Sequence, residues 1–185
     1  MVVYSNSIEW IPMILSGLGT NVLIVILSAI LPLVVGIGLT VLMHFTRKTA
    51  LPKVFRLVSV LPESIAPIAL ILVAFFFVFA TATQSILPVV ITLTVCFLGY
   101  MVIRYDDRDS LIKNILVHGI GLLAELFKWS LAICGTVAVR DLVKSAALIV
   151  GRTYEIAYYF IPLIISFCIL IVLYIGRQPC KEFMK

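Results

Sequence analysis

Five long apolar runs constrain this chain more than any other feature, because about 20 apolar residues are what a helix needs to cross a bilayer. The runs cover residues 10–45, 57–80, 85–103, 111–135 and 156–176. Hydrophobic residues make up 63% of the 185 residues and charged residues only 12%, whereas a soluble domain is about half apolar and a quarter charged. The sequence therefore predicts an all-α, polytopic membrane protein of about five transmembrane helices, in a single domain over residues 1–185.

The first run is too long for one straight crossing, since its 36 residues would extend about 54 Å as a helix. Pro12 and the polar residues Ser16, Thr20 and Asn21 indicate that its first part lies at the membrane interface. We expect the crossing itself to run from about residue 19 to residue 45. The first eight residues contain no Lys or Arg, so they lack the basic segment of a signal peptide.

The distribution of Lys and Arg predicts the orientation, because cytoplasmic loops of membrane proteins carry an excess of both. If the spans alternate, only Arg140, Lys144 and Arg152 lie on one side. Ten lie on the other side, and these are Arg47, Lys48, Lys53, Arg56, Arg104, Arg108, Lys113, Arg177, Lys181 and Lys185. We therefore expect the N-terminus outside and the C-terminus in the cytoplasm.

A charged segment separates the last two runs on the predicted outer side. Its apolar residues recur at helical spacing, with Arg140, Asp141 and Lys144 on the opposite face. We expect residues 142–149 to be helical, with these three charged side chains reaching water or each other. An amphipathic helix on the outer mouth of the bundle fits this pattern, and so does a re-entrant segment that covers a cavity.

Charged residues inside the apolar runs are the candidates for a solute pathway. Glu125 lies midway along the fourth run, and Lys128 follows at the spacing of an ion pair on one helix face. A carboxylate in the bilayer costs several kcal/mol, so a partner is expected. The pair is either an internal neutralisation or a polar lining that meets both charges of an amino acid. His118, two helical turns before Glu125, shares its face. Glu63, which Pro62 and Pro67 flank, either faces protein or a cavity, or it reaches the interface or pairs with Arg56.

Several functions lack their motifs. The chain contains no phosphate-binding loop for ATP, no nucleophile with a base on one side of the membrane, and no basic stripe with aromatic residues for nucleic acid. Its four cysteines show no metal-binding spacing. We therefore expect no catalysis, no metal, no nucleic acid and no cofactor in this chain.

Two regions resemble the amino-acid-type permease subunits of ABC importers, the histidine/glutamine permease family. The stretch "LSGLGTNVLIVILSAILPLVVGIGLTVLMHFTRK" is similar to the first span of that family, and the stretch from residue 130 to residue 178 is similar to its C-terminal part. Two extra residues are needed between Ala132 and Val139. The matching positions are Ser130, Leu131, Ala132, Val139, Asp141, Leu142, Arg152, Thr153 and Tyr154.

The resemblance implies a type I importer fold in the bacterial cytoplasmic (inner) membrane and amino-acid transport by alternating access, without covalent chemistry. Its partners would be a second permease subunit in a homo- or heterodimer, a separate ATPase subunit that uses the ATP, and an extracytoplasmic solute-binding protein. An outer gate would then include Ser130, Arg140, Asp141, Lys144, Arg152 and Tyr154.

The chain departs from the family where the ATPase would dock. The family has a Glu-Ala-Ala loop with a short docking helix between spans three and four, and this chain has only "RYDDRDSLIKN". The remaining candidates for coupling are Tyr105, Asp106, Asp107, Arg108 and Asp109, with Tyr105 as the expected aromatic anchor. Two alternatives stay open: a degenerate permease-like subunit with a structural or regulatory role and no ATP coupling, and an unrelated small helical membrane protein such as an enzyme or channel component.

Overall fold

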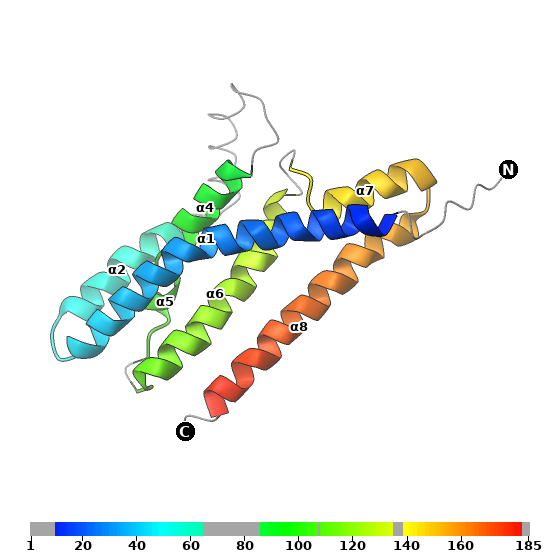
Figure 1. Ribbon diagram of the computed structural model, residues 1–185. Coiled ribbons are helices and arrows are strands. Elements are labelled where there is room, and N and C mark those ends of the chain that lie inside the picture. Colours follow the sequence, from blue (N-terminus) through cyan, green and yellow to red (C-terminus); the bar gives the residue numbers. More distant parts are fainter. Residues whose placement is uncertain (1–9, 65–85, 107, 135–138, 183–185) are drawn as a thin grey trace.

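The computed structural model describes residues 10–64, 86–106, 108–134 and 139–182, and these residues form helices and turns without a strand. Figure 1 shows how the helices are arranged in space. In chain order they are α1 (Ile11–Phe45), α2 (Leu51–Ser64), α4 (Leu87–Phe97), α5 (Tyr100–Ile103), α6 (Leu111–Cys134), α7 (Leu142–Thr153), the 3-10 helix η3 (Ile156–Tyr159) and α8 (Phe160–Glu182). The predicted all-α class is confirmed for the described residues.

Three described helices are long and apolar enough to cross a membrane: α1, α6, and the run Ile156–Gln178 formed by η3 and α8. They correspond to the first, fourth and fifth predicted spans. The third predicted span is shorter, because α4 and α5 together cover only Leu87–Ile103 and separate at Leu98 and Gly99. Most of the second, residues 65–80, lies outside the described residues. The expected count of five is therefore not confirmed.

Helix α1 is continuous over 35 residues, which is about 52 Å at the rise of an α-helix. The expected interfacial segment and the expected crossing are thus parts of one helix. The buried residues recur every three or four positions, so one stripe of α1 faces the bundle. Small and polar residues are frequent in that stripe, and these are Gly17, Asn21, Ser28, Ala29, Gly36 and Thr40.

Pro32 lies inside α1 without ending it. A proline has no N–H, so the carbonyl of Ser28, four residues earlier, loses its helical donor. The hydroxyl of Thr94 in α4 donates to that carbonyl at 3.4 Å, and the hydroxyl of Ser28 donates to the carbonyl of Val90 at 3.4 Å. A neighbouring helix thus supplies the polar contact that a membrane interior cannot supply.

Two glycines of α1 allow other elements to approach its backbone. A Cβ atom at Gly17 would lie 2.5 Å from Ser145 Oγ and 2.6 Å from the Asp141 carbonyl oxygen, and one at Gly36 would lie 2.7 Å from Met101 Sδ. Helix α1 therefore packs tightly against α7 near one end and against α5 near the other. Small residues serve this purpose at helix contacts within membranes.

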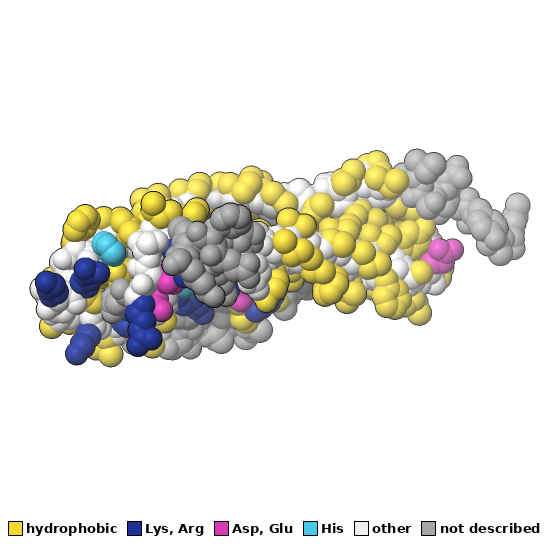
Figure 2. Space-filling view, turned by 90° about the horizontal axis from the view of Figure 1, so that it is seen from below, with side chains coloured by type: hydrophobic (Ala, Val, Ile, Leu, Met, Phe, Trp, Pro, Cys, Tyr) yellow, Lys and Arg dark blue, Asp and Glu magenta, His cyan; other side chains and the backbone are white. Residues whose placement is uncertain are grey.

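Charge and hydrophobicity are segregated along the molecule. Figure 2 shows Lys and Arg side chains gathered at the end where α1 meets α2, and hydrophobic side chains over much of the rest. Helix α6 begins and helix α8 ends near this same end in Figure 1. The segments that carry the predicted cytoplasmic Lys and Arg residues, as far as the structure describes them, thus lie toward one end of the bundle.

Candidate solute site and outer helix

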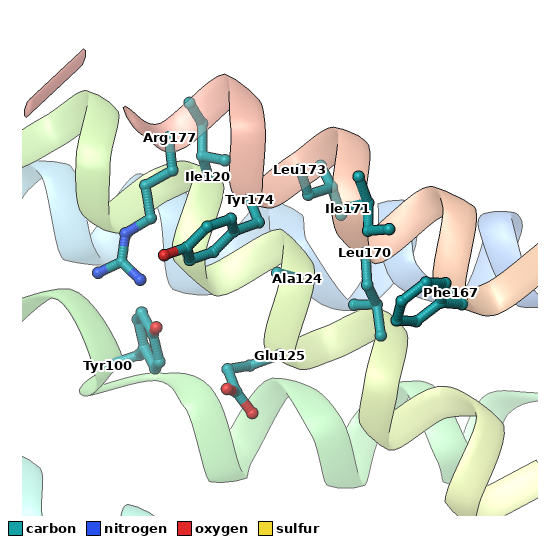
Figure 3. Close-up of a pocket in the computed structure, with 11 residues that line it drawn as sticks. Tyr100, Ile120, Ala124, Glu125, Phe167, Leu170, Ile171, Leu173, Tyr174 and Arg177 are labelled. Atoms are coloured by element: carbon teal, nitrogen blue, oxygen red, sulfur yellow. The ribbon is translucent and has the colours of Figure 1, made fainter. Parts of the chain in front are cut away.

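A cavity of about 380 Å³, open to the surface beside Phe167 and Tyr174, lies between α6 and α8, with Tyr100 of α5 on one side (Figure 3). Most of its wall is apolar, and the exceptions are two tyrosines and two charged residues. The lining residues are Tyr100, Ile120, Gly121, Ala124, Glu125, Phe167, Leu170, Ile171, Leu173, Tyr174 and Arg177. A largely apolar cavity with a few polar groups is the usual form of a small-molecule site.

Glu125 brings negative charge to this cavity and carries its own counter-ion. Its Oε2 lies 2.8 Å from Nζ of Lys128, and the two side chains are 36% and 56% exposed. The expected pairing at this spacing on α6 is therefore confirmed. Lys128 does not line the cavity. The cation that pairs with Glu125 therefore lies outside the cavity wall.

Arg177 brings positive charge to the same cavity from α8. Its Nε is buried and has no hydrogen-bond partner among the described residues. A Cβ atom at Gly121 would lie 3.5 Å from the guanidinium carbon of Arg177 and 2.9 Å from the hydroxyl oxygen of Tyr100. Gly121 thus lets both polar groups reach the same part of α6, and Figure 3 shows Arg177 and Tyr174 extending from α8 toward Tyr100.

Tyr100 is held by a second cation at the edge of the cavity. The guanidinium carbon of Arg104 lies 3.8 Å from the centre of the Tyr100 ring, which is the geometry of a cation–π contact. Tyr100 itself is 4% exposed. The ring is therefore fixed on one face while its hydroxyl group reaches Gly121.

The structure separates the four residues that the sequence predicted for a pathway. Glu125 lines the cavity and Lys128 pairs with it, whereas His118 lies on α6 outside the lining. Glu63 belongs to α2, and its side chain lies outside the described residues. Sequence reasoning missed Arg177, Tyr100 and Tyr174. The available signal was that Tyr174 and Arg177 are three residues apart and so share a helix face.

The helix predicted over residues 142–149 exists as part of α7, and its first turn is set by Asp141. This residue is the N-cap, and its Oδ1 accepts a hydrogen bond from the backbone N–H of Lys144 at 2.8 Å. The sequence placed Asp141 in water or beside the basic residues, and the first alternative was wrong, because the residue is fully buried. Burial raises the pKa of its carboxyl, although hydrogen bonds from the backbone of Lys144 and Val143 act in the opposite direction.

The other residues of the expected outer gate lie at different depths. Arg140 and Arg152 are exposed and Lys144 is partly exposed, with the Arg152 guanidinium carbon 5.9 Å from the centre of the Trp10 ring. Tyr154 is 87% exposed and ends α7 at φ 60°, a left-handed position that glycine usually occupies. Ser130 is fully buried in α6.

A buried polar cluster ties α7 to α1 and α6. Oδ1 of Asn21 accepts from the backbone N–H of Leu142 at 3.0 Å, and its Nδ2 donates to Ser130 Oγ at 3.4 Å. The Ser130 hydroxyl donates in turn to the carbonyl of Phe127 at 2.8 Å. Asn21 therefore satisfies one of the free N–H groups at the start of α7.

The expected ATPase-coupling loop is folded against its own chain. Asn114 accepts from the backbone N–H of Asp106 at 2.9 Å and donates to the carbonyls of Asp106, Asp109 and Ser110 at 2.9, 3.3 and 3.2 Å. Lys113 Nζ lies 2.7 Å from Asp109 Oδ1. Residues 104–106 and 108–110 form no helix, and Asp107 lies outside the described residues. Asp106 and Arg108 are exposed.

Tyr105 does not offer the surface anchor that the sequence suggested. It is 3% exposed, its hydroxyl lies 3.1 Å from Nδ1 of His44, and its carbonyl accepts from Nη2 of Arg56 at 2.7 Å. These contacts join the loop to α1 and α2. The expectation fails because the aromatic ring is already used inside the fold.

No protein-family model matches the chain, and neither a characterised protein nor a solved structure matches it.

Proposed function

We propose that the chain is the membrane-spanning permease subunit of an ABC importer for amino acids in the bacterial inner membrane. It works by alternating access beside a second permease subunit, while a separate ATPase uses the ATP. The N-terminus faces outward and the C-terminus faces the cytoplasm.

The observation that carries this proposal is the pair of opposite charges, Glu125 and Arg177, on one cavity between two helices of membrane length. A charged group within a bilayer is expensive, and one that faces a cavity, as Glu125 does, usually marks the path of a solute or ion. A cavity with both signs suits a solute that carries both signs. Helix α7, tied to α1 and α6 through Asn21, supports an outer cover at which a binding protein delivers the solute.

The test is uptake by reconstituted vesicles. The chain is co-expressed with a P-loop ATPase and a solute-binding protein encoded beside it, and uptake of radiolabelled amino acids is measured with ATP and with a non-hydrolysable analogue. We expect uptake only with ATP, and a loss of uptake in Glu125→Gln. Glu155→Gln is the matched control, because Glu155 is exposed beyond the end of α7. Equal uptake with both nucleotides would refute the importer.

A second candidate is a degenerate permease-like subunit without ATP coupling, and the buried Tyr105 with its non-helical loop favours it. A photo-reactive amino acid placed at the exposed Asp106 or Arg108 distinguishes the two functions. Cross-linking to a P-loop ATPase supports the importer. Its absence, under conditions in which the corresponding loop of a sibling permease does cross-link, supports the degenerate subunit.

A further inference from the structure

We propose that the cavity between α6 and α8 selects α-amino acids with a neutral, apolar side chain. This inference rests on the proposed function, because it names the solute class of that function. It starts from two facts: Arg177 has no acidic partner among the described residues, and the rest of the cavity wall offers few polar groups.

Arg177 binds the carboxylate of the solute. A guanidinium group that leaves water needs an anion, and it forms paired hydrogen bonds with a carboxylate. Its Nε is buried and has no partner among the described residues, so the empty cavity leaves unmade a hydrogen bond that a carboxylate would accept. The Tyr100 hydroxyl lies against the same part of Gly121 and extends the polar end of the cavity.

Glu125 binds the ammonium group. Its carboxylate lines the cavity while Lys128 holds one oxygen from outside the wall. Lys128 is thus the counter-ion of Glu125 while the cavity is empty. A bound ammonium group adds a second cation to an acceptor with two oxygens, and a carboxylate can accept from both.

The remaining wall sets the side-chain specificity. Ile120, Ala124, Phe167, Leu170 and Ile171 are all apolar. Among the lining residues, only Glu125 and Arg177 carry a charge at neutral pH, and the backbone groups of the solute use both. A charged side chain would lose its water without gaining a counter-ion. The volume of about 380 Å³ is near the lower end for ligand sites, which fits a small solute.

The test is equilibrium binding to the purified full chain in lipid nanodiscs, without ATPase or ATP. We expect radiolabelled leucine to bind, and lysine and glutamate to bind at least about 10-fold more weakly. Two fragments divide the roles of the charges: 4-methylpentanoate lacks the ammonium group and isoamylamine lacks the carboxylate. Each should bind on the order of 10-fold or more below leucine, since a hydrogen bond to a charged group is lost. If 4-methylpentanoate binds as well as leucine, the assignment of Glu125 is refuted.

Substitutions locate the site within the chain. Arg177→Gln and Glu125→Gln should each weaken leucine binding at least about 10-fold. Arg177→Lys should keep part of the binding, because the positive charge remains while the paired N–H donors of the guanidinium group are lost. Arg47→Gln and Glu155→Gln change the same residue types at exposed positions outside the cavity and should leave binding within about twofold. Gel filtration and thermal unfolding of each variant report folding. If folded Arg177→Gln binds leucine like the wild type, the proposal is wrong.

A lipid phosphate could supply the same anion, so the assay includes nanodiscs with and without phosphatidylglycerol. Phenylglyoxal modification of Arg177, followed by mass spectrometry, should be slowed by leucine in both lipids. Protection by phosphatidylglycerol but not by leucine would assign Arg177 to a headgroup and overturn the proposal. Leucine binding without ATP-dependent uptake would keep this site and refute the importer. ATP-dependent uptake of a charged amino acid alone would keep the importer and refute this site.

Discussion

Replacing Asn21 by alanine should weaken the attachment of α7 to the bundle, so that an open state, in which α7 is detached, becomes more populated. The Asn21 side chain is fully buried, and its Oδ1 is the acceptor for the buried N–H of Leu142 at 3.0 Å. A buried donor left without a partner costs about 1–3 kcal/mol. The contact with Ser130 Oγ is longer, at 3.4 Å, and adds little. The open state of α7 should therefore become about 5- to 150-fold more populated, since 1.4 kcal/mol is a factor of ten.

The assay uses a cysteine at Ser145, which is fully buried in α7 and whose hydroxyl has no partner among the described residues. The four native cysteines are first replaced by alanine, and the purified protein is treated with a polar maleimide. If α7 opens and closes faster than the reagent reacts, the labelling rate follows the population of the open state.

Thr20→Ala is the matched control for Asn21→Ala. Thr20 precedes Asn21 on α1, but its hydroxyl donates only to the Ser16 carbonyl of its own helix at 3.1 Å. Its labelling rate should stay within about twofold of the parent. If Asn21→Ala also stays within that range, Asn21 does not hold α7, and the reasoning from an orphaned N–H is refuted.

Three further predictions concern other parts of the molecule. A cytoplasm-dependent reporter should be active after Lys185 and inactive after Thr83, and activity at Thr83 would overturn the proposed orientation. Burial raises the pKa of Asp141 above its ordinary value of about 4. The protonated carboxyl therefore stabilises α7 fully below about pH 4, and this stabilisation is lost as the pH rises through the raised pKa. Hydrogen exchange in α7, corrected for the intrinsic rate, should thus be slower at about pH 5 than at about pH 7, and Asp141→Asn should remove the difference. Tyr105→Phe loses the contact with His44 and should lower the free energy of unfolding by about 0.5–1.5 kcal/mol in a thermal or denaturant titration. It should leave ATPase cross-linking at Asp106 unchanged. A loss of cross-linking would restore Tyr105 as a docking residue.

The sequence predicts best those features that local pattern determines. The apolar runs give α1, α6 and α8, because hydrophobic length is a property of each segment by itself. The spacing of apolar residues gives α7, which includes all of the expected helix from Leu142 to Ile149. The ion pair of Glu125 and Lys128 follows from their spacing on one helix.

The features that the sequence does not predict depend on distant partners. Asp141 is buried because α1 approaches it at Gly17, and nothing near Asp141 in the sequence signals this. Tyr105 is buried because His44, 61 residues away, reaches its hydroxyl. Arg177 reads as one more basic residue after the last apolar run. Only the packing of α8 against α6 turns it toward a cavity.

The two glycine contacts of α1 connect the two ends of the bundle through a single helix. Gly17 and Gly36 lie roughly 28 Å apart along the helix axis. Gly17 sits against the backbone of Asp141 and the side chain of Ser145, and Gly36 sits against the side chain of Met101. At Gly17 part of the contact is backbone, which cannot change rotamer to absorb a small displacement as a side chain can. Because α1 is one continuous helix, a tilt that loosens its contact with α5 also shifts its contact with α7, so α7 and the basic end of the molecule are mechanically coupled.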